Sequence, residues 1–321
     1  MLPPSIAVVE FTFSPIAQVG SWTVRLETIA LAGVVFVALL LAALSARRTP
    51  IDLRREPDAR LPPDGEPNRL RPDDLLFIAV ATIPGAVAGG RIGYLILHYD
   101  YYSANSAAFL DVTQGGFELS LAVVGGTITG VIVAGLLGAP VGRWMHALIV
   151  PLLIALGAGK VAMMLGGDGQ GLPWDGSWAT AYLGPGPWGS LAPEVPSHPS
   201  QAYEAFATVL VILVVLTLLT VGRFERKAGG VFLLGIALWA IARAVVATTW
   251  RNPAVLGPLN MGQVLALSVA AGMLLLLALN VVATSRRPDV PIDEPAVVDT
   301  PDDQAEADGP SWADPTSRPR I

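Results

Sequence analysis

Seven long apolar stretches, separated by polar links, set the pattern of this chain. A helix that crosses the hydrocarbon core of a bilayer needs about 20 mainly apolar residues. Each stretch meets that length and contains few charges. The pattern therefore predicts an all-α, polytopic membrane protein with about seven transmembrane helices. The predicted helices are Thr23–Ala46, Leu75–His98, Phe117–Leu137, Trp144–Gly166, Gln201–Val221, Gly229–Thr249 and Met261–Thr284.

Composition supports the same class of protein. Hydrophobic residues make up 53% of the chain and charged residues only 14%, whereas about a quarter of a soluble domain is charged. The chain contains no cysteine, which excludes a disulfide, a thiolate metal site and a thiol nucleophile. We expect neither a metal nor a cofactor, and we do not expect nucleic acid as a partner.

The lysines and arginines between the helices predict the orientation, because such residues gather in cytoplasmic loops. Fifteen of them lie on one side, in the link 47–74, the turn at Arg143, the link 223–227 and the segment after Thr284. The other side has only Arg251. The sequence therefore predicts an N-terminus outside the cell and a C-terminus in the cytoplasm. Residues 1–22 carry no Lys or Arg, so the first helix does not resemble a cleavable signal peptide.

Three parts follow from this topology. Residues 1–22 are predicted to form an extracytoplasmic segment, and residues 23–284 a seven-helix transmembrane domain with an extracytoplasmic loop at 167–200. Residues 285–321 contain nine of the 26 acidic residues, many prolines and few apolar side chains. Such a segment buries too little surface to offset the entropy of ordering. We expect it to be a disordered cytoplasmic tail.

Charged residues within the predicted helices are candidates for a functional site, because each costs ~2.5 kcal/mol or more at mid-bilayer. The embedded cations are Arg25, Arg91, Lys160 and Arg243. The embedded acids are Glu27, Glu118 and Glu204, with Asp168 just beyond the fourth helix. All lie toward the predicted outer side. Salt bridges between them would be a purely structural explanation, but the surplus of fully embedded cations favours an anionic ligand such as a lipid phosphate.

Three short motifs resemble those of the bacterial prolipoprotein diacylglyceryl transferases. They are Gly89-Gly90-Arg91-Ile92-Gly93-Tyr94, His198-Pro199-Ser200-Gln201-Ala202-Tyr203-Glu204 and Asn260-Met261-Gly262-Gln263. Their order, spacing and outer-side positions are similar to those of the family, and the resemblance covers about residues 10–285.

The resemblance implies a reaction in the bacterial cell membrane. These enzymes transfer the diacylglyceryl group of phosphatidylglycerol to the lipobox cysteine thiol of a prolipoprotein signal peptide, and release glycerol phosphate. Catalytic roles would fall to Arg243 and to His198 or Glu204, the last two as groups for proton transfer. Substrate binding would fall to Arg91, Tyr94, Lys160, Asp168, Gly171 and Gln201.

The sequence departs from the family pattern at several positions. Lys160 and Asp168 stand where the fourth-helix motif has Arg and Glu, and Val124 precedes Gly125-Gly126 where the family has His. Glu27 replaces a Tyr in the first helix. Arg and Lys are not equivalent at a bidentate phosphate site. A non-catalytic homologue that binds anionic lipid or assists lipoprotein handling is therefore the alternative to a divergent transferase.

Overall fold

A computed structural model describes residues 8–51, 69–109, 111, 116–222 and 229–285. Within them, seven helices are long and apolar enough to cross a membrane, which confirms the predicted number. Their bounds agree with the predicted ones to within three residues. All but the first residue of the predicted tail 285–321, and most of the basic link 47–74, lie outside the described residues. The seven helices are α1 (Leu26–Arg48), α2 (Pro72–Leu97), α4 (Leu119–Leu136), α5 (Val141–Met164), α6 (Ser200–Thr220), α7 (Gly230–Val246) and α8 (Met261–Ser285).

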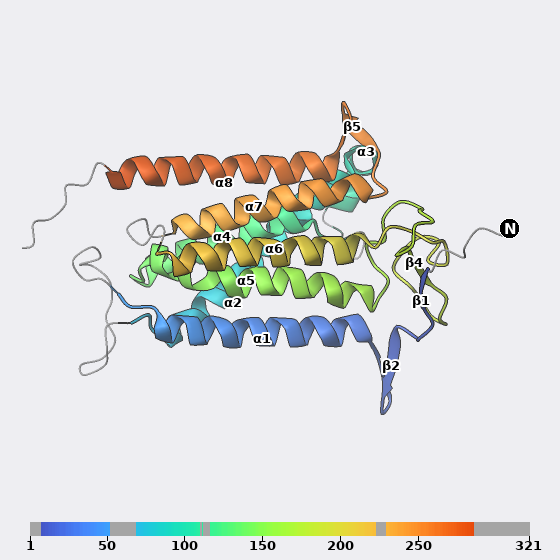
Figure 1. The fold of residues 1–321 in the computed structure, drawn as a ribbon, viewed down its shortest axis with the longest axis horizontal. Helices are drawn as coiled ribbons and strands as arrows, with labels where there is room; N and C mark the ends of the chain where they lie inside the picture. The colour runs from blue at the N-terminus through green and yellow to red at the C-terminus, as the bar shows by residue number, and fades with distance from the viewer. Residues whose placement is uncertain (1–7, 52–68, 110, 112–115, 223–228, 286–321) are drawn as a thin grey trace, which may run out of the picture. The chain divides into compact units, whose positions relative to one another are not determined.

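Short elements gather at one end of the helices, which we call the head end (Figure 1); the opposite end is the tail end. Three two-stranded sheets form there, one parallel and two antiparallel. The parallel pair joins β1 (Val9–Phe11) to β4 (Thr180–Tyr182), and the hairpins join β2 (Ile16–Val19) to β3 (Trp22–Arg25) and β5 (Ala254–Leu256) to β6 (Leu259–Asn260). The short helices are α3 (Tyr99–Ala104), η1 (Ser106–Phe109) and η2 (Ala247–Thr249).

The first helix begins three residues later than predicted. Thr23 belongs to β3, whose residues pair with β2 across a turn that contains Gly20. Gly20 has a φ of +62°, which glycine adopts without steric cost. The backbone groups of residues 22–25 therefore bond across the hairpin and not along a helix.

Helices α2 and α4 approach each other closely at glycine residues. A methyl group at Gly85 would overlap the carbonyl oxygen of Gly125, and one at Gly125 would overlap that of Gly85. A methyl at Gly89 would likewise overlap the carbonyl of Leu121. Small residues let two helices approach closely where lipid supplies no hydrophobic driving force. This contact fixes the start of α4 beside the Gly89–Tyr94 motif.

Among the residues that the structure describes, the buried apolar side chains form two clusters. The larger one, centred on α7, includes Ile149, Leu153, Val215 and Ile236. The smaller one, which we call the tail-end cluster, joins α1, α2, α4 and α5 and consists of Ala42, Ala46, Ile51, Leu70, Leu75, Ile78, Ala134, Ala139, Trp144 and Ala147.

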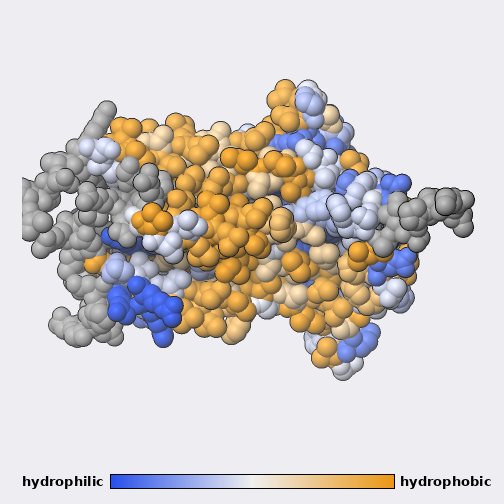
Figure 2. All heavy atoms as spheres, viewed as in Figure 1, coloured by the Kyte–Doolittle hydropathy of each residue, from blue (hydrophilic) through white to orange (hydrophobic). Residues whose placement is uncertain are grey.

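The visible outer surface of the helices is apolar, whereas hydrophilic side chains gather toward the two ends (Figure 2). Phe36 on α1, Leu213 on α6 and Leu275 on α8 are all more than half exposed. Exposed apolar surface of this extent is unfavourable in water but matches lipid chains. The chain is a multi-pass membrane protein.

Candidate functional site

Four charged side chains from four helices meet inside the head end, and we call them the ionic cluster: Glu118, Lys160, Glu204 and Arg243. Arg243 Nη1 donates to Glu204 Oε2 at 2.5 Å, and its Nη2 donates to Glu118 Oε1 at 3.3 Å. Lys160 Nζ lies 3.2 Å from the same Oε2 atom of Glu204. Lys160 is the most exposed of the four side chains, at 12%. The cluster thus balances two cations with two carboxylates.

The sequence predicts a surplus of embedded cations, whereas the ionic cluster contains equal numbers of cations and carboxylates. Lys160 and Arg243 each face a carboxylate, because the starts of α4 and α6 bring Glu118 and Glu204 to the same depth. Buried charges need such partners, since an unpaired buried ion costs several kcal/mol. The pairing also keeps the cationic side chains in fixed positions.

Glu118 holds its place because it is also the N-cap of α4. Its two carboxylate oxygens accept hydrogen bonds from the backbone N–H groups of Ser120 and Leu121, both at 2.8 Å. The backbone N–H of Glu118 donates to the carbonyl of Gly90 at 2.8 Å. An acidic N-cap satisfies two of the free amides of a helix start and favours its dipole. The glycine-rich motif on α2 thereby positions one member of the ionic cluster.

Hydrogen bonds and an aromatic ring fix the position of the Arg243 side chain. Its Nε donates to Ser120 Oγ at 3.0 Å, and its guanidinium carbon lies 4.6 Å from the centre of the Trp250 ring. Trp250 in turn packs on Gly262, where a methyl group would overlap the indole ring. The guanidinium plane is therefore fixed by hydrogen bonds at its edge and by an aromatic face.

The Asn260–Gln263 motif supports the same end of α7. The backbone N–H of Gln263 donates to Asn260 Oδ1 at 2.9 Å, and the backbone N–H of Asn260 donates to Gln263 Oε1 at 3.0 Å. This reciprocal pair is a capping box for α8. The two side chains also donate to the carbonyls of Ala247 and Ala244. The motif thus attaches α8 to the turn that follows Arg243.

Arg25, Glu27 and Asp168 form a second group of charged side chains at the head end, which we call the Arg25 triad. Arg25 Nη2 lies 3.4 Å from Glu27 Oε2 and 3.5 Å from Asp168 Oδ2. Gly166 and Gly189 make room for it, since a methyl group at either would overlap a carboxylate of the triad. Arg25 and Asp168 are each more than a third exposed, so solvent weakens these pairs.

Arg91 lies at the head end, as predicted, where it donates hydrogen bonds to backbone carbonyls. Its Nη2 donates to the carbonyls of Ala108 at 3.2 Å and Asp111 at 2.9 Å. Its guanidinium carbon also lies 5.4 Å from the centre of the Tyr102 ring. Tyr94, one turn further along α2, stacks on His98. Arg91 therefore supports the segment that follows α3, and its role as a phosphate ligand stays a prediction.

His198 lies among aromatic rings just before α6. Its ring stacks on Trp174, with centroids 4.5 Å apart and planes 6° apart. Its Nδ1 lies 3.4 Å from Tyr203 Oη, which accepts a hydrogen bond from Trp178 Nε1 at 2.8 Å. Burial lowers the pKa of His198 from its ordinary value, so its ring is neutral at pH 7. Within the described residues, no hydrogen bond or ion pair joins His198 to the ionic cluster.

Gly171 and Gln201 are structural links between the loop 167–200 and the helices. The N–H of Gly171 donates to the carbonyl of His198 at 2.8 Å, and a methyl group at Gly171 would overlap the carbonyl of Thr249. Gln201 Nε2 donates to the carbonyl of Asp168 at 2.5 Å. These contacts fix the loop over the ends of α5 and α6. The substrate-binding roles that the family resemblance implies for both residues stay predictions.

The family resemblance assigned no role to Glu118, Ser120, Arg25 or Glu27. Arg25, Glu27 and Glu118 were candidates only as charged residues within the predicted helices. Glu118 and Glu27 gave a signal, since each is an acid at the edge of an apolar stretch. Ser120 gave none, because a serine near a helix start is common in any protein.

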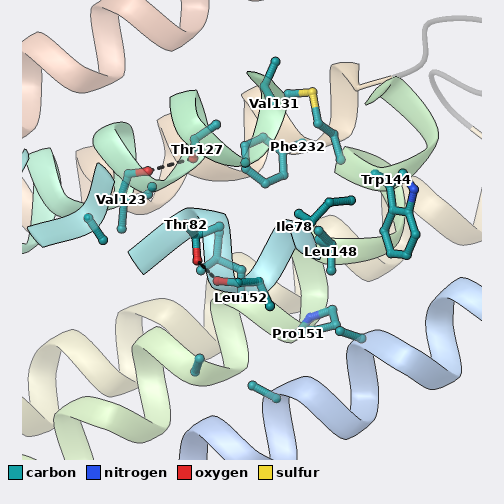
Figure 3. A pocket seen from close by; sticks show the side chains of 18 of the residues that line it. Ile78, Thr82, Val123, Thr127, Val131, Trp144, Leu148, Pro151, Leu152 and Phe232 are labelled. Atoms are coloured by element: carbon teal, nitrogen blue, oxygen red, sulfur yellow. Dashed lines mark hydrogen bonds between the residues drawn. The ribbon is translucent and has the colours of Figure 1, made fainter. Parts of the chain in front are cut away.

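An apolar cavity of about 400 Å³ lies between α1, α2, α4, α5 and α7. Its lining begins at Leu119, between Glu118 and Ser120 of the site, and reaches Trp144 near the tail end. Figure 3 shows the labelled side chains around it, with Val123 at one end and Trp144 at the other. Its volume is within the range of small-molecule sites, and its lining suits a hydrocarbon.

Comparisons with known proteins point to one family. Residues 16–279 match the family model of the prolipoprotein diacylglyceryl transferases. A phosphatidylglycerol–prolipoprotein diacylglyceryl transferase of Geobacter sulfurreducens is 32% identical over 61% of this chain and 74% of its own length. A protein of the same name from Clostridioides difficile is 25% identical over 62% of this chain and 75% of its own length. Another, from a Nostoc species, is 23% identical over 80% of this chain and 86% of its own length.

The match extends from the β2–β3 hairpin almost to the end of α8. It therefore includes the ionic cluster, the Arg25 triad and all three motifs. From these matches, the chain belongs to the prolipoprotein diacylglyceryl transferase family.

Proposed function

We propose that this protein transfers the diacylglyceryl group of phosphatidylglycerol to the lipobox cysteine thiol of a prolipoprotein in the bacterial plasma membrane. The cysteine sulfur forms a bond to the glyceryl carbon that carried the phosphate. The carbon–oxygen bond to that phosphate breaks, and glycerol phosphate leaves with the bonding electrons. The thiol proton passes to a base. The relatives named for this reaction support the proposal.

One observation carries the proposal: Lys160 and Arg243 converge on a single oxygen atom of Glu204, at 3.2 Å and 2.5 Å. Two cations from different helices thus define a point where an anionic oxygen is stabilised. A leaving phosphate gains charge as its ester bond breaks, and preorganised cations at that point would lower the barrier. Glu204 would have to yield its place to a phosphate oxygen, and the flexible stem of Lys160 suits that exchange.

The proton acceptor is proposed to be His198. Its neutral ring can take a proton, and the depression of its pKa comes from burial. It lies in the loop 167–200 immediately before α6, the helix that carries Glu204. A signal peptide lying along the head end would bring its cysteine between the loop and the ionic cluster.

The lipid is proposed to enter with its phosphate at the ionic cluster and its chains toward the tail end. The apolar cavity continues from Leu119 in that direction. With the predicted orientation, the head end is extracytoplasmic and the donor lipid comes from the outer leaflet. The placement of Arg47 and Arg48 at the tail end of α1 supports this orientation.

A transfer assay tests the proposal. Purified protein in detergent receives phosphatidylglycerol and a lipobox peptide, and mass spectrometry measures the diacylglyceryl peptide. Arg243→Gln should lower the rate about 100- to 1000-fold, the usual cost of losing one preorganised donor. The matched control is Arg48→Gln, an exposed arginine at the tail end, which should leave the rate unchanged.

The same assay separates the alternative function. No transfer by the natural protein, together with phosphatidylglycerol binding that Arg243→Gln abolishes, would identify a non-catalytic lipid-binding homologue. If the natural protein shows no transfer and does not bind phosphatidylglycerol, both proposed functions are wrong.

A further inference from the structure

At the tail end, which we call its floor, the apolar cavity is lined by buried side chains. Five of its lining residues also belong to the tail-end cluster: Ala42, Leu75, Ile78, Ala134 and Trp144. Trp144 is the largest of them, and only 2% of its surface is exposed. It lies in the first turn of α5 and packs with buried residues of α1, α2 and α4. An occupant that enters from the head end therefore meets a packed aromatic wall.

The lining of the opposite end is apolar but begins next to two residues that contact Arg243 of the ionic cluster. Leu119, its first lining residue on α4, lies between Glu118 and Ser120, both of which contact Arg243. The lining then follows α4 to Ala134, a rise of ~22 Å at 1.5 Å per residue. Half of a bilayer's hydrocarbon core is only ~15 Å thick. The cavity is therefore long enough to contain one complete acyl chain whose headgroup stays at the ionic cluster.

The cavity also has an entrance for such a chain. Val35 and Leu39 of α1 line it and are 54% and 43% exposed on the lipid-facing surface. A chain can thus move in sideways from the bilayer without passing the polar head end. Because lipid tails are as apolar as the lining, little free energy is gained when the chain leaves the bilayer. Selection between chains must come from their fit against the floor.

We infer that Trp144 sets the longest acyl chain of the donor lipid that the protein accepts. The inference rests on the proposed function, since it assumes a phospholipid donor with its phosphate at the ionic cluster. Trp144 acts as a specificity-determining residue: it does not touch the reacting atoms, and it limits how far the chain can extend while the phosphate stays in place. Within the described residues, its Nε1 has no hydrogen-bond partner, so a smaller apolar residue breaks no polar contact there.

Two variants shift the limit in opposite directions. Trp144→Leu should lengthen the cavity at its tail end, so that longer acyl chains fit. Ala38→Phe should shorten the cavity, because Ala38 lines it one turn before Ala42, ~6 Å closer to the head end. The matched control is Ala32→Phe, at an exposed position of α1 that is not part of the lining.

The experiment measures binding, so that it does not depend on catalysis. Each full-length protein is incubated in detergent with an equimolar mixture of dimyristoyl-, dipalmitoyl- and distearoyl-phosphatidylglycerol. Native mass spectrometry then gives the bound fraction of each lipid. A methylene that no longer fits an apolar pocket typically costs about tenfold or more. We expect at least that change in the distearoyl-to-dimyristoyl ratio, upward for Trp144→Leu and downward for Ala38→Phe.

The outcomes separate the two proposals. Lipid binding with the same ratio in the natural protein, Trp144→Leu and Ala38→Phe would overturn the role of Trp144 and leave the proposed function standing. A downward shift in Ala32→Phe equal to that in Ala38→Phe would overturn it too, because that position lies outside the cavity. The absence of any bound phosphatidylglycerol in the natural protein would refute the proposed function and this inference together. If Trp144→Leu does not fold, the comparison of Ala38→Phe with Ala32→Phe decides the question.

Discussion

Lys160 Nζ lies 3.2 Å from Glu204 Oε2, and both side chains are almost completely buried. The two residues come from neighbouring helices, α5 and α6, and the same Glu204 oxygen also accepts from Arg243. One carboxylate oxygen therefore organises the two cations on which the proposed chemistry depends. Because the cluster is charge-balanced, a change at this oxygen should affect both the stability of the fold and the proposed transfer reaction.

The first prediction concerns Glu204→Gln. The substitution keeps the shape of the side chain but leaves Lys160 and Arg243 with one carboxylate between them. Removing one partner of a buried ion pair typically costs about 3–5 kcal/mol. Thermal unfolding in detergent should show a large loss of stability, whereas Glu194→Gln at an exposed site should change little.

A double variant sharpens this test. Glu204→Gln combined with Lys160→Met again balances the charges in the cluster. Its loss of stability should be smaller than the sum of the two single losses, because the residues share one interaction. Simple additivity would contradict the described contact.

The second prediction concerns Lys160, where the family motif has arginine. Lys160→Met should lower the transfer rate about 100- to 1000-fold. Lys160→Arg should raise it, because a guanidinium can bind Glu204 and a phosphate oxygen through separate N–H groups. Initial rates with a lipobox peptide measure both effects. Equal rates for the natural protein and the Met variant would exclude Lys160 from the chemistry.

The helices could be predicted from the sequence because a bilayer leaves few alternatives for long apolar stretches. The start of α1 differs from its predicted position because of a strand. Trp22, Thr23 and Val24 extend the apolar stretch, yet they form a strand because the turn at Gly20 brings β2 beside them. Hydropathy reports burial in lipid and cannot report a hairpin at its edge.

The site could be predicted only in part, for a physical reason. Counting basic residues along the loops grouped Lys160 and Arg243 at the same end, and the structure has them together. Which carboxylates these cations contact was not predictable. Glu118, for example, is 125 residues away from Arg243 in sequence and meets it through the packing of α2 on α4. For Arg91, the motif indicated a ligand-binding role, which stays a prediction; its Nη2 donates hydrogen bonds to backbone carbonyls that sequence alone could not identify.

The third prediction tests the orientation. The natural chain has no cysteine, so single cysteines report accessibility without a background. Ser106→Cys and Ser177→Cys, both exposed at the head end, should react with an impermeant thiol reagent in intact cells. Ala59→Cys, in the basic link 47–74, should react only after the cells are opened. The opposite pattern would reverse the proposed orientation and the leaflet of the donor lipid.

The fourth prediction concerns pH and His198. Burial lowers the pKa of this ring below its ordinary value of 6.5. The folded state therefore binds the proton less well than the unfolded chain. The contribution of neutral His198 to the stability of the folded state is complete above the ordinary pKa. This contribution is lost as the pH falls through the folded-state pKa. His198→Phe can still stack on Trp174 but cannot be protonated. Between about pH 8 and about pH 5, the Tm of the natural protein should fall relative to that of the variant; parallel curves would contradict the assignment.

The fifth prediction concerns the capping box between Asn260 and Gln263. Gln263→Ala removes an acceptor for the N–H of Asn260 and a donor to the carbonyl of Ala244. A lost cap typically costs about 1 kcal/mol, and a buried group left without its partner adds ~1–3 kcal/mol. The Tm should therefore fall, while Asn252→Ala, at an exposed position nearby, should leave it unchanged. Because Ala244 directly follows Arg243, the transfer rate of Gln263→Ala should also fall at temperatures where the protein is still folded. A lower Tm with full transfer activity would show that the box stabilises α8 without positioning Arg243.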